Sequence, residues 1–219
     1  MDSGDFEQVS EEERTPSVKI IVIGPVGSGK TSIVRRFVHD HFMQNYKATI
    51  GVDFCRKNAY LPESNHKVDL NFWDLAGDDR FNSVSSIYYR NAVGVFVVFD
   101  VTRPSTVQGA LKWYHQLDER YEEEDRPPVV FLANKIDLKR QTNYEEIAGL
   151  VDAPGTPLAE KKVGGVIETS AKDDVDIDKA VQLMLALVEA RMPSEALAAK
   201  SSPVLELRQK RALSDSCCS

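Results

Sequence analysis

The chain has 219 residues, of which 42% are hydrophobic and 28% charged, with a formal net charge of −7 and a pI near 5.2. This length and composition fit one globular domain with terminal segments. The acidic balance argues against a nucleic-acid partner, because such binding depends on Lys and Arg that neutralise phosphates. No stretch approaches the roughly 18 apolar residues that a membrane-spanning helix requires.

Both ends of the chain differ in composition from its middle. Residues 1–14 carry many Asp and Glu side chains against a single Arg, so residues 1–16 are predicted to form a disordered acidic arm and not a signal peptide. Residues 192–219 show no lasting helical period and predict a flexible tail. The folded domain is therefore expected to span residues 17–191.

The three cysteines do not suggest a disulfide framework. Cys55 stands alone in a strand pattern and is expected to be a small packed side chain. Cys217 and Cys218 are adjacent, and neighbouring cysteines do not readily cross-link a fold. A reducing compartment, the cytosol, fits this pattern best.

The first predicted strand, residues 18–23, leads into a glycine-rich loop, and a helix is predicted from Lys30 to about His41. Backbone N–H groups of such a loop can turn inward around a polyphosphate, which a Cβ atom would hinder. Lys30 then reaches the β- and γ-phosphates, and the hydroxyl of Thr31 can bind Mg²⁺. The phosphate-binding residues are predicted to be Gly24, Val26, Gly27, Ser28, Gly29, Lys30 and Thr31.

Residues 42–51 predict a loop, and the strands that follow, 52–61 and 67–73, are separated by a turn of hairpin length. The second strand runs into Asp74, at the carboxyl end where ligands of open α/β sheets gather. Asp74 can hold Mg²⁺ there, and Gly77 leaves room for its N–H to face a γ-phosphate. A helical segment is expected from about residue 79 to residue 90.

The apolar run 92–99 predicts a strand buried on both faces, as in a parallel sheet, and it ends in Asp100. A helix over 105–121 and a strand over 129–133 follow, and this strand delivers Asn134, Lys135, Ile136 and Asp137. A carboxylate at Asp137 accepts two N–H donors of a guanine edge, which no adenine edge satisfies, and the Lys135 stem can lie along the ring. Asn134, Lys135 and Asp137 are therefore predicted to recognise guanine.

Residues 138–164 are the least regular, with a capping box at Asn143 and Glu146 that predicts a short helix. The strand 166–169 precedes Ser170, Ala171 and Lys172, and a helix is predicted over 176–191. Strands and helices alternate, which predicts an α/β fold with a six-stranded, mostly parallel sheet and helices on both faces.

With these motifs in this order, the chain resembles the Ras superfamily of small GTPases over about residues 17–191, and the implied fold is the P-loop NTPase small G-domain. The resemblance implies that Phe42 stacks edge-on against guanine and that Thr49, in the first switch, closes over Mg²⁺ and the γ-phosphate. It also implies that the Ala171 N–H meets the guanine oxygen, with Ser170 and Lys172 beside it. Metal binding is thus expected at Thr31, Thr49 and Asp74.

Within the superfamily the chain resembles the Rab proteins, through Ile50-Gly51-Val52-Asp53-Phe54, Tyr88-Tyr89-Arg90-Asn91-Ala92 and Phe99-Asp100-Val101-Thr102. Residues 31–39, 48–50 and 111–113 are similar to the Rab branch of lysosome-related organelles. The resemblance implies that Phe54, Trp73 and Tyr88 form the aromatic triad with which Rabs meet effectors. Core packing is the alternative role for these three rings.

The ending Cys217-Cys218-Ser219 is not a C-a-a-X box, because Ser216 stands fourth from the end. It resembles the Rab site for double geranylgeranylation, and two lipid chains anchor a protein where one is marginal. The resemblance implies a lipid-anchored protein on the cytoplasmic face of an intracellular membrane that cycles with the cytosol. Its implied partners are an exchange factor, a GTPase-activating protein, a GDP-dissociation inhibitor and effectors.

Two positions depart from the family in ways that bear on hydrolysis. Asp78 stands where Rabs usually have the glutamine that orients the attacking water, and an ionised carboxylate only accepts hydrogen bonds. Val26 stands where many Rabs have serine, close to the path of an activator's arginine. The catalytic set is expected to be Lys30, Thr49, Gly77 and Asp78, with slow turnover.

The sequence thus predicts a Rab-like, Mg²⁺-dependent switch that binds GTP and GDP and hydrolyses GTP slowly. One alternative is a GTP-binding interaction module with little or no hydrolysis that cycles by exchange. A P-loop ATPase or kinase is the third interpretation, and Asn134 and Asp137 disfavour it.

Overall fold

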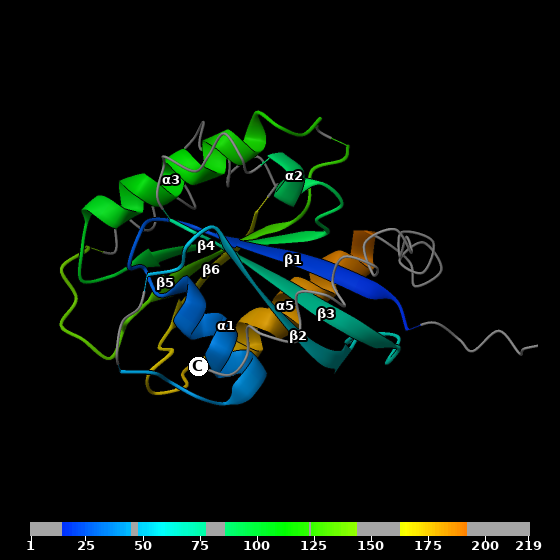
Figure 1. Cartoon of the computed structure of the whole chain (residues 1–219), viewed down its shortest axis with the longest axis horizontal. Coiled ribbons are helices and arrows are strands. Elements are labelled where there is room, and N and C mark those ends of the chain that lie inside the picture. Colours follow the sequence, from blue (N-terminus) through cyan, green and yellow to red (C-terminus); the bar gives the residue numbers. More distant parts are fainter. Residues whose placement is uncertain (1–14, 45–47, 78–85, 123, 144–162, 192–219) are drawn as a thin grey trace, which may run out of the picture.

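The structure is a computed structural model that describes residues 15–44, 48–77, 86–122, 124–143 and 163–191. One six-stranded sheet of order β2-β3-β1-β4-β5-β6 lies between helices on both faces (Figure 1). Strand β2 pairs with β3 antiparallel, and the other four neighbouring pairs are parallel. The strands are β1 (Ser17–Ile23), β2 (Val52–Tyr60), β3 (Lys67–Leu75), β4 (Gly94–Asp100), β5 (Val129–Asn134) and β6 (Val163–Thr169). The helices are α1 (Lys30–His39), α2 (Ser86–Tyr89), α3 (Ser105–Asp118) and α5 (Ile177–Arg191).

The predicted fold class is confirmed, and the differences are in the limits of the elements. Strand β3 continues to Leu75, beyond the predicted end, because its pairing with β2 extends to Val52. Strand β6 begins at Val163 instead of 166, since its ladder with β5 starts at Val129. Helix α3 ends at Asp118 instead of 121. Most of the helical segment predicted over 79–90, and the capping glutamate at 146, lie outside the described residues.

The central strands β1, β4 and β5 are buried on both faces, as the apolar runs predict, whereas the edge strand β2 is partly exposed. Side chains of β1 alternate between two cores: Ile20 and Val22 pack into a cluster with α1 and α5, whereas Ile21 and Ile23 pack into a cluster with α3. Cys55 is buried in the first of these clusters, as expected for a small packed side chain. Two separate apolar layers therefore hold the helices against the sheet.

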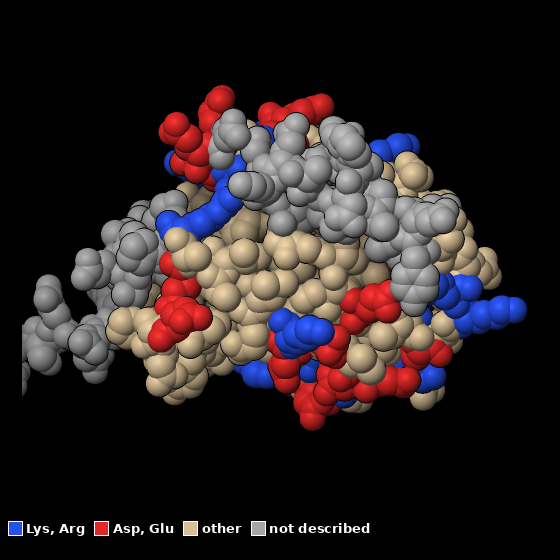
Figure 2. All heavy atoms as spheres, turned by 180° about the vertical axis from the view of Figure 1, so that it is seen from behind, with Lys and Arg blue, Asp and Glu red and all other residues tan. Residues whose placement is uncertain are grey.

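The surface facing away from the view of Figure 1 has acidic and basic side chains interspersed along its margins and other residues in its centre (Figure 2). Among the described residues, no helix has both the length and the apolar character needed to span a membrane.

The sheet brings the functional loops together. The parallel strands β1, β3, β4, β5 and β6 all end at one edge, where the register sets Val22 beside Asp74, Asp100 beside Asn134, and Asn134 beside Thr169. Motifs that are far apart in sequence thus meet at a single carboxyl edge.

Candidate functional site

The phosphate loop, Gly24–Thr31, connects β1 to α1 in a backbone path that requires glycine. Gly24 has φ 137°, and a Cβ there would lie 2.2 Å from the carbonyl oxygen of Val98. Gly29 has φ 99°, and a Cβ there would lie 2.2 Å from Nδ2 of Asn134. Both conformations belong to the region that side chains avoid. The loop is therefore built as a tight cradle against the ends of β4 and β5.

Lys30 is buried at this loop, and its Nζ donates to the carbonyl oxygens of Gly24 at 2.9 Å and Pro25 at 3.1 Å. Burial lowers the pKa of Lys30 to about 8, because the charged form is deprived of water. Gly77 approaches so closely that a Cβ on it would lie 2.6 Å from the Lys30 ammonium and 2.6 Å from the Val26 nitrogen. An anion at this point would favour the charged form of Lys30 and raise its pKa again.

Three oxygen-bearing side chains converge beside the loop, from three different elements. The hydroxyls of Thr31 and Thr49 lie 2.8 Å apart, Thr49 donates to Oδ2 of Asp74 at 3.3 Å, and Thr31 donates to the same oxygen. Burial raises the pKa of Asp74 to about 6, although the two hydroxyls and Lys30 oppose this shift. The three predicted magnesium ligands are thus brought together.

The remaining oxygen of this carboxylate tests whether a metal fits. Oδ1 of Asp74 is buried and accepts no hydrogen bond from any residue that the structure describes. An unpaired buried carboxylate oxygen is costly, and two hydroxyls with a carboxylate are hard oxygen ligands of the kind Mg²⁺ prefers. The residues present therefore fit a magnesium ion.

The guanine loop, Asn134–Asp137, follows β5. Asn134 donates from Nδ2 to the Ser28 carbonyl at 2.9 Å. Lys135, which has φ 70°, donates to the Gly27 carbonyl at 2.8 Å. Asp137 accepts from the Ser170 hydroxyl at 2.7 Å, and its side chain is almost fully buried. The predicted base-binding and phosphate-binding residues are therefore joined directly.

The S-A-K loop, Ser170–Lys172, completes this arrangement. The Ala171 N–H donates to Oδ1 of Asn134 at 3.3 Å, and the Lys172 ammonium lies 4.0 Å from Oδ2 of Asp137. Arg36 of α1 donates to the Ala171 carbonyl at 2.9 Å and to the Lys172 carbonyl at 3.0 Å. The S-A-K loop is thus fixed from both sides.

The other predicted site residues are placed as follows. Phe42 is half-buried against the core cluster beside α1 and α5. The rings of Phe54 and Trp73 lie 5.4 Å apart and those of Trp73 and Tyr88 lie 5.9 Å apart, so the three aromatic residues form one cluster. Asp78, Cys217 and Cys218 lie outside the described residues.

Three residues at the site were not predicted from the sequence. Asp100, Arg103 and Arg36 all bind the nucleotide-site loops or their side chains. Asp100 carried a signal, since it follows an apolar strand in the same way as Asp74. Arg36 and Arg103 carried none, because arginine is common in helices and loops whatever it contacts.

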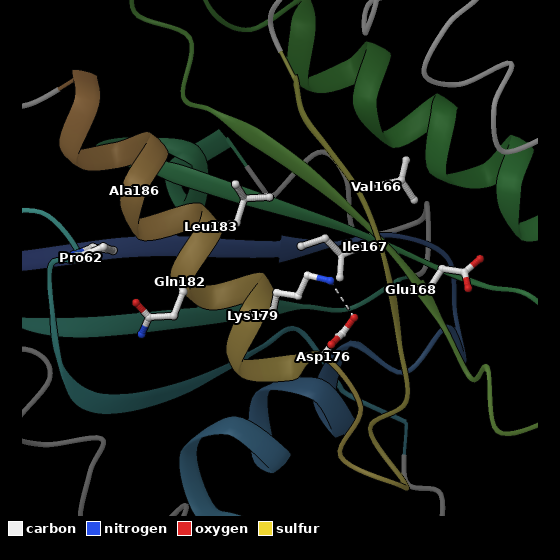
Figure 3. Close-up of a pocket in the computed structure, with 9 residues that line it drawn as sticks. All are labelled: Pro62, Val166, Ile167, Glu168, Asp176, Lys179, Gln182, Leu183 and Ala186. Carbon is white, nitrogen blue, oxygen red and sulfur yellow. Dashed lines mark hydrogen bonds and ion pairs between the residues drawn. The ribbon is translucent and has the colours of Figure 1, made fainter.

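A shallow hollow on the side of the molecule formed by β6 and α5 does not resemble this site (Figure 3). Its lining is largely apolar, and its charged groups are paired: Asp176 with Lys179 at 3.1 Å, and Glu168 with Arg140. The charged groups there are thus engaged with one another, unlike the polar groups at the strand ends.

The comparisons with known proteins agree with the geometry at the strand ends. The sequence profile described as the Ras family matches residues 19–190. The chain belongs to the Ras family. Ras-related protein Rab-32 of Homo sapiens is 41% identical over 176 residues, which cover 80% of this chain and 76% of that protein.

Further Ras-family relatives extend this similarity. Ras-related protein Rab-32A of Dictyostelium discoideum is 42% identical over 171 residues, covering 76% of this chain and 75% of that protein. Ras-related protein RIC1 of Oryza sativa is 35% identical over 205 residues, covering 92% of this chain and 96% of that protein. The predicted Rab resemblance is confirmed, and these relatives support the Rab-32 branch of the family.

The chain is therefore a Rab-type small GTPase, a guanine-nucleotide switch of membrane traffic. Its cofactors are GTP or GDP with Mg²⁺, and its reaction is the hydrolysis of GTP to GDP and phosphate.

Proposed function

We propose that this Rab-type switch hydrolyses GTP unusually slowly, and the observation that carries the proposal is Asp78. A glutamine donates to one oxygen and accepts from the attacking water at once, while an ionised carboxylate only accepts. At about 6 Å and an effective dielectric constant of about 20, a carboxylate and a phosphate charge repel by roughly 2 to 3 kcal/mol before screening. Turnover should therefore fall below the ~10⁻⁴ s⁻¹ of Ras-type proteins acting alone.

The proposal also assigns the residues that would bind GTP and Mg²⁺. The phosphate loop would cradle the β- and γ-phosphates, with Lys30 as their cation. Thr31, Thr49 and Asp74 would hold Mg²⁺, which supplies charge neutralisation at the phosphates. Asn134 and Asp137, with the Ala171 N–H, would recognise guanine. Thr49 and Gly77 would sense the third phosphate.

Val26 supports slow assisted turnover as well. Its side chain is 48% exposed and branched at Cβ, while its main-chain nitrogen lies against Gly77. A partner's arginine that enters beside the phosphate loop has to pass this side chain. Activators of Rabs resemble one another in supplying both an arginine and a glutamine, so assisted hydrolysis remains part of the proposal.

A second candidate function is a GTP-binding interaction module that cycles by exchange alone, and Asp78 favours it too. Two measurements separate the candidates. Conversion of bound GTP to GDP at a measurable rate, accelerated by an activator domain, supports the slow GTPase. GTP that persists in freshly isolated protein and does not respond to an activator supports the module.

We also propose that Phe54, Trp73 and Tyr88 form the effector surface. What supports this is their contact across β3, β2 and α2, and the partial exposure of all three rings. Capture of effectors by protein loaded with a non-hydrolysable GTP analogue should be lost in Trp73→Ala and kept in Tyr60→Ala. Tyr60 is a matched control because it is an exposed aromatic residue at the far end of β2.

Membrane attachment is proposed to depend on geranylgeranyl groups at Cys217 and Cys218, with a GDP-dissociation inhibitor carrying the protein through the cytosol. The tail is nearly neutral, so lipid and not a basic patch would supply the affinity. A variant with both cysteines replaced by serine should be found in the soluble fraction of cells, and single replacements show whether one lipid suffices.

A further inference from the structure

The buried carboxylate of Asp100, at the end of β4, is surrounded by hydrogen-bond donors. Its side chain is 1% exposed. Oδ1 accepts from the backbone N–H of Thr102 at 2.9 Å and from its hydroxyl at 2.6 Å. Oδ2 accepts from Nε of Arg103 at 2.9 Å and from Nζ of Lys135 at 2.7 Å. These four bonds use the full acceptor capacity of a carboxylate.

This carboxylate stays charged in the folded protein. Burial alone would raise the pKa of Asp100, but hydrogen bonds from Lys135 and Thr102 hold it below its usual value. Asp100 is therefore a fixed anion between two cations from neighbouring loops.

The two cationic side chains that bind Asp100 also donate hydrogen bonds to the phosphate loop. Arg103 donates from Nη2 to the Val26 carbonyl at 3.1 Å, and Lys135 donates to the Gly27 carbonyl at 2.8 Å. In a trans peptide the C=O and the next N–H point to opposite sides. Holding these two carbonyls on one side therefore fixes the N–H groups of Gly27 and Ser28 on the other side.

We propose that Asp100 and Arg103 are positioning residues that slow nucleotide release. They hold Lys135 and the carbonyls of Val26 and Gly27 in place, so that the guanine loop and the phosphate loop bind the nucleotide together. The proposal rests on the nucleotide site described above and not on the slow hydrolysis. Neither residue is required to touch the nucleotide. Loss of either one would loosen both loops together.

The competing role is purely structural, because Asp100 also shapes the turn between β4 and α3. Its backbone carbonyl accepts from the hydroxyl of Thr106 and from the N–H of Arg103, each at 3.0 Å. A side chain that only shaped this turn would affect the melting temperature and leave nucleotide release unchanged. The test must therefore measure release and melting separately.

The measurement is the dissociation of fluorescently labelled GDP from the full chain in excess GDP and Mg²⁺. Asp100→Asn removes the negative charge between Lys135 and Arg103 and replaces one of the two acceptor oxygens by an NH₂ group, so release should accelerate about 10- to 100-fold, as expected for lost charged hydrogen bonds. Arg103→Lys keeps the charge, but one ammonium replaces a guanidinium that reaches both Asp100 and Val26. It should accelerate release about 3- to 10-fold.

Two control variants separate the roles. Thr102→Val removes the hydroxyl bond to Oδ1 but keeps the backbone N–H bond to it, and both cations bind the other oxygen, so release should remain within about twofold of wild type. Arg126→Gln breaks the ion pair of Arg126 with Asp118, at 2.6 Å, near the opposite end of α3, so it lowers the melting temperature without reaching the site.

Faster GDP release in Asp100→Asn and Arg103→Lys, with unchanged release in the two controls, supports the proposal. Wild-type release rates in both variants overturn it, and so does equal acceleration in Arg126→Gln at a comparable melting temperature. If Asp100→Asn does not fold, Arg103→Lys decides. Because only GDP is used, the result is independent of the hydrolysis rate.

Discussion

The hydroxyl oxygens of Thr31 and Thr49 lie 2.8 Å apart, which joins the start of α1 to the loop before β2. Both hydroxyls also contact the same carboxylate oxygen of Asp74. This arrangement links the first switch to the proposed magnesium site through side-chain oxygens alone. The switch loop can therefore respond directly to the metal and the phosphates.

The first prediction concerns Thr49. Thr49→Ala removes its hydroxyl, so the affinity for a GTP analogue with Mg²⁺ should fall about 2- to 10-fold more than the affinity for GDP, as expected for one hydrogen bond. Thr49→Ser keeps the hydroxyl and should behave like wild type. Equilibrium titrations with both nucleotides measure the difference. An equal loss for GDP and the GTP analogue in Thr49→Ala would contradict this role.

The second prediction is proton uptake on nucleotide binding. Burial lowers the folded-state pKa of Lys30 to about 8, so much of the nucleotide-free protein carries a neutral lysine at pH 8.5. The phosphates of GDP favour the ammonium, and binding should take up about 0.5 to 1 proton at pH 8.5 and far less at pH 7. Calorimetry in buffers of different ionisation enthalpy measures this number of protons. EDTA is present so that no Mg²⁺ binds and deprotonates Asp74.

Lys19 is the matched control for this experiment. Burial lowers its pKa to about 8 as well, but its ammonium lies over the ring of Trp73 at 4.6 Å and donates to the Arg90 carbonyl. Lys19→Gln should therefore leave the proton uptake unchanged. If the number of protons is the same at pH 7 and pH 8.5 in wild type, the assignment to Lys30 is wrong.

The third prediction concerns base selection by Asp137. Asp137→Asn replaces two acceptor oxygens by one acceptor and one donor, so GTP affinity should fall about 10- to 100-fold. The new donor suits the carbonyl at the xanthine 2-position, and xanthine nucleotides should bind better than to wild type. Competition between GTP, XTP and ATP measures the selectivity. An unchanged preference for guanine in Asp137→Asn would show that another group recognises the base.

The strands were predictable because burial on both faces leaves continuous apolar runs, as in β4. Their limits were less predictable, since pairing and not hydrophobicity decides them. Gly164 and Gly165 interrupt the apolar pattern of β6, yet the ladder with β5 begins at Val163. The sequence also could not show that Phe54, Trp73 and Tyr88 contact one another.

The site was predictable where the chemistry of the ligand dictates residue type, as in the phosphate loop and the guanine loop. The links between these loops were not. Arg36 and the Ala171 carbonyl are 135 positions apart, and an arginine in a helix gives no sign of a distant partner. The position of Asp100 at the end of an apolar strand was visible in the sequence, but its contact with Lys135 depends on the register that sets it beside Asn134.

The central claim is that Asp78 slows the hydrolysis of GTP, and a single-turnover hydrolysis assay tests it most directly. Full-length protein and its Asp78→Gln variant are loaded with GTP, Mg²⁺ is added, and conversion to GDP is followed over time. We expect a wild-type rate below ~10⁻⁴ s⁻¹ and a gain of about 10-fold or more in the glutamine variant. A glutamine variant no faster than wild type would contradict the account.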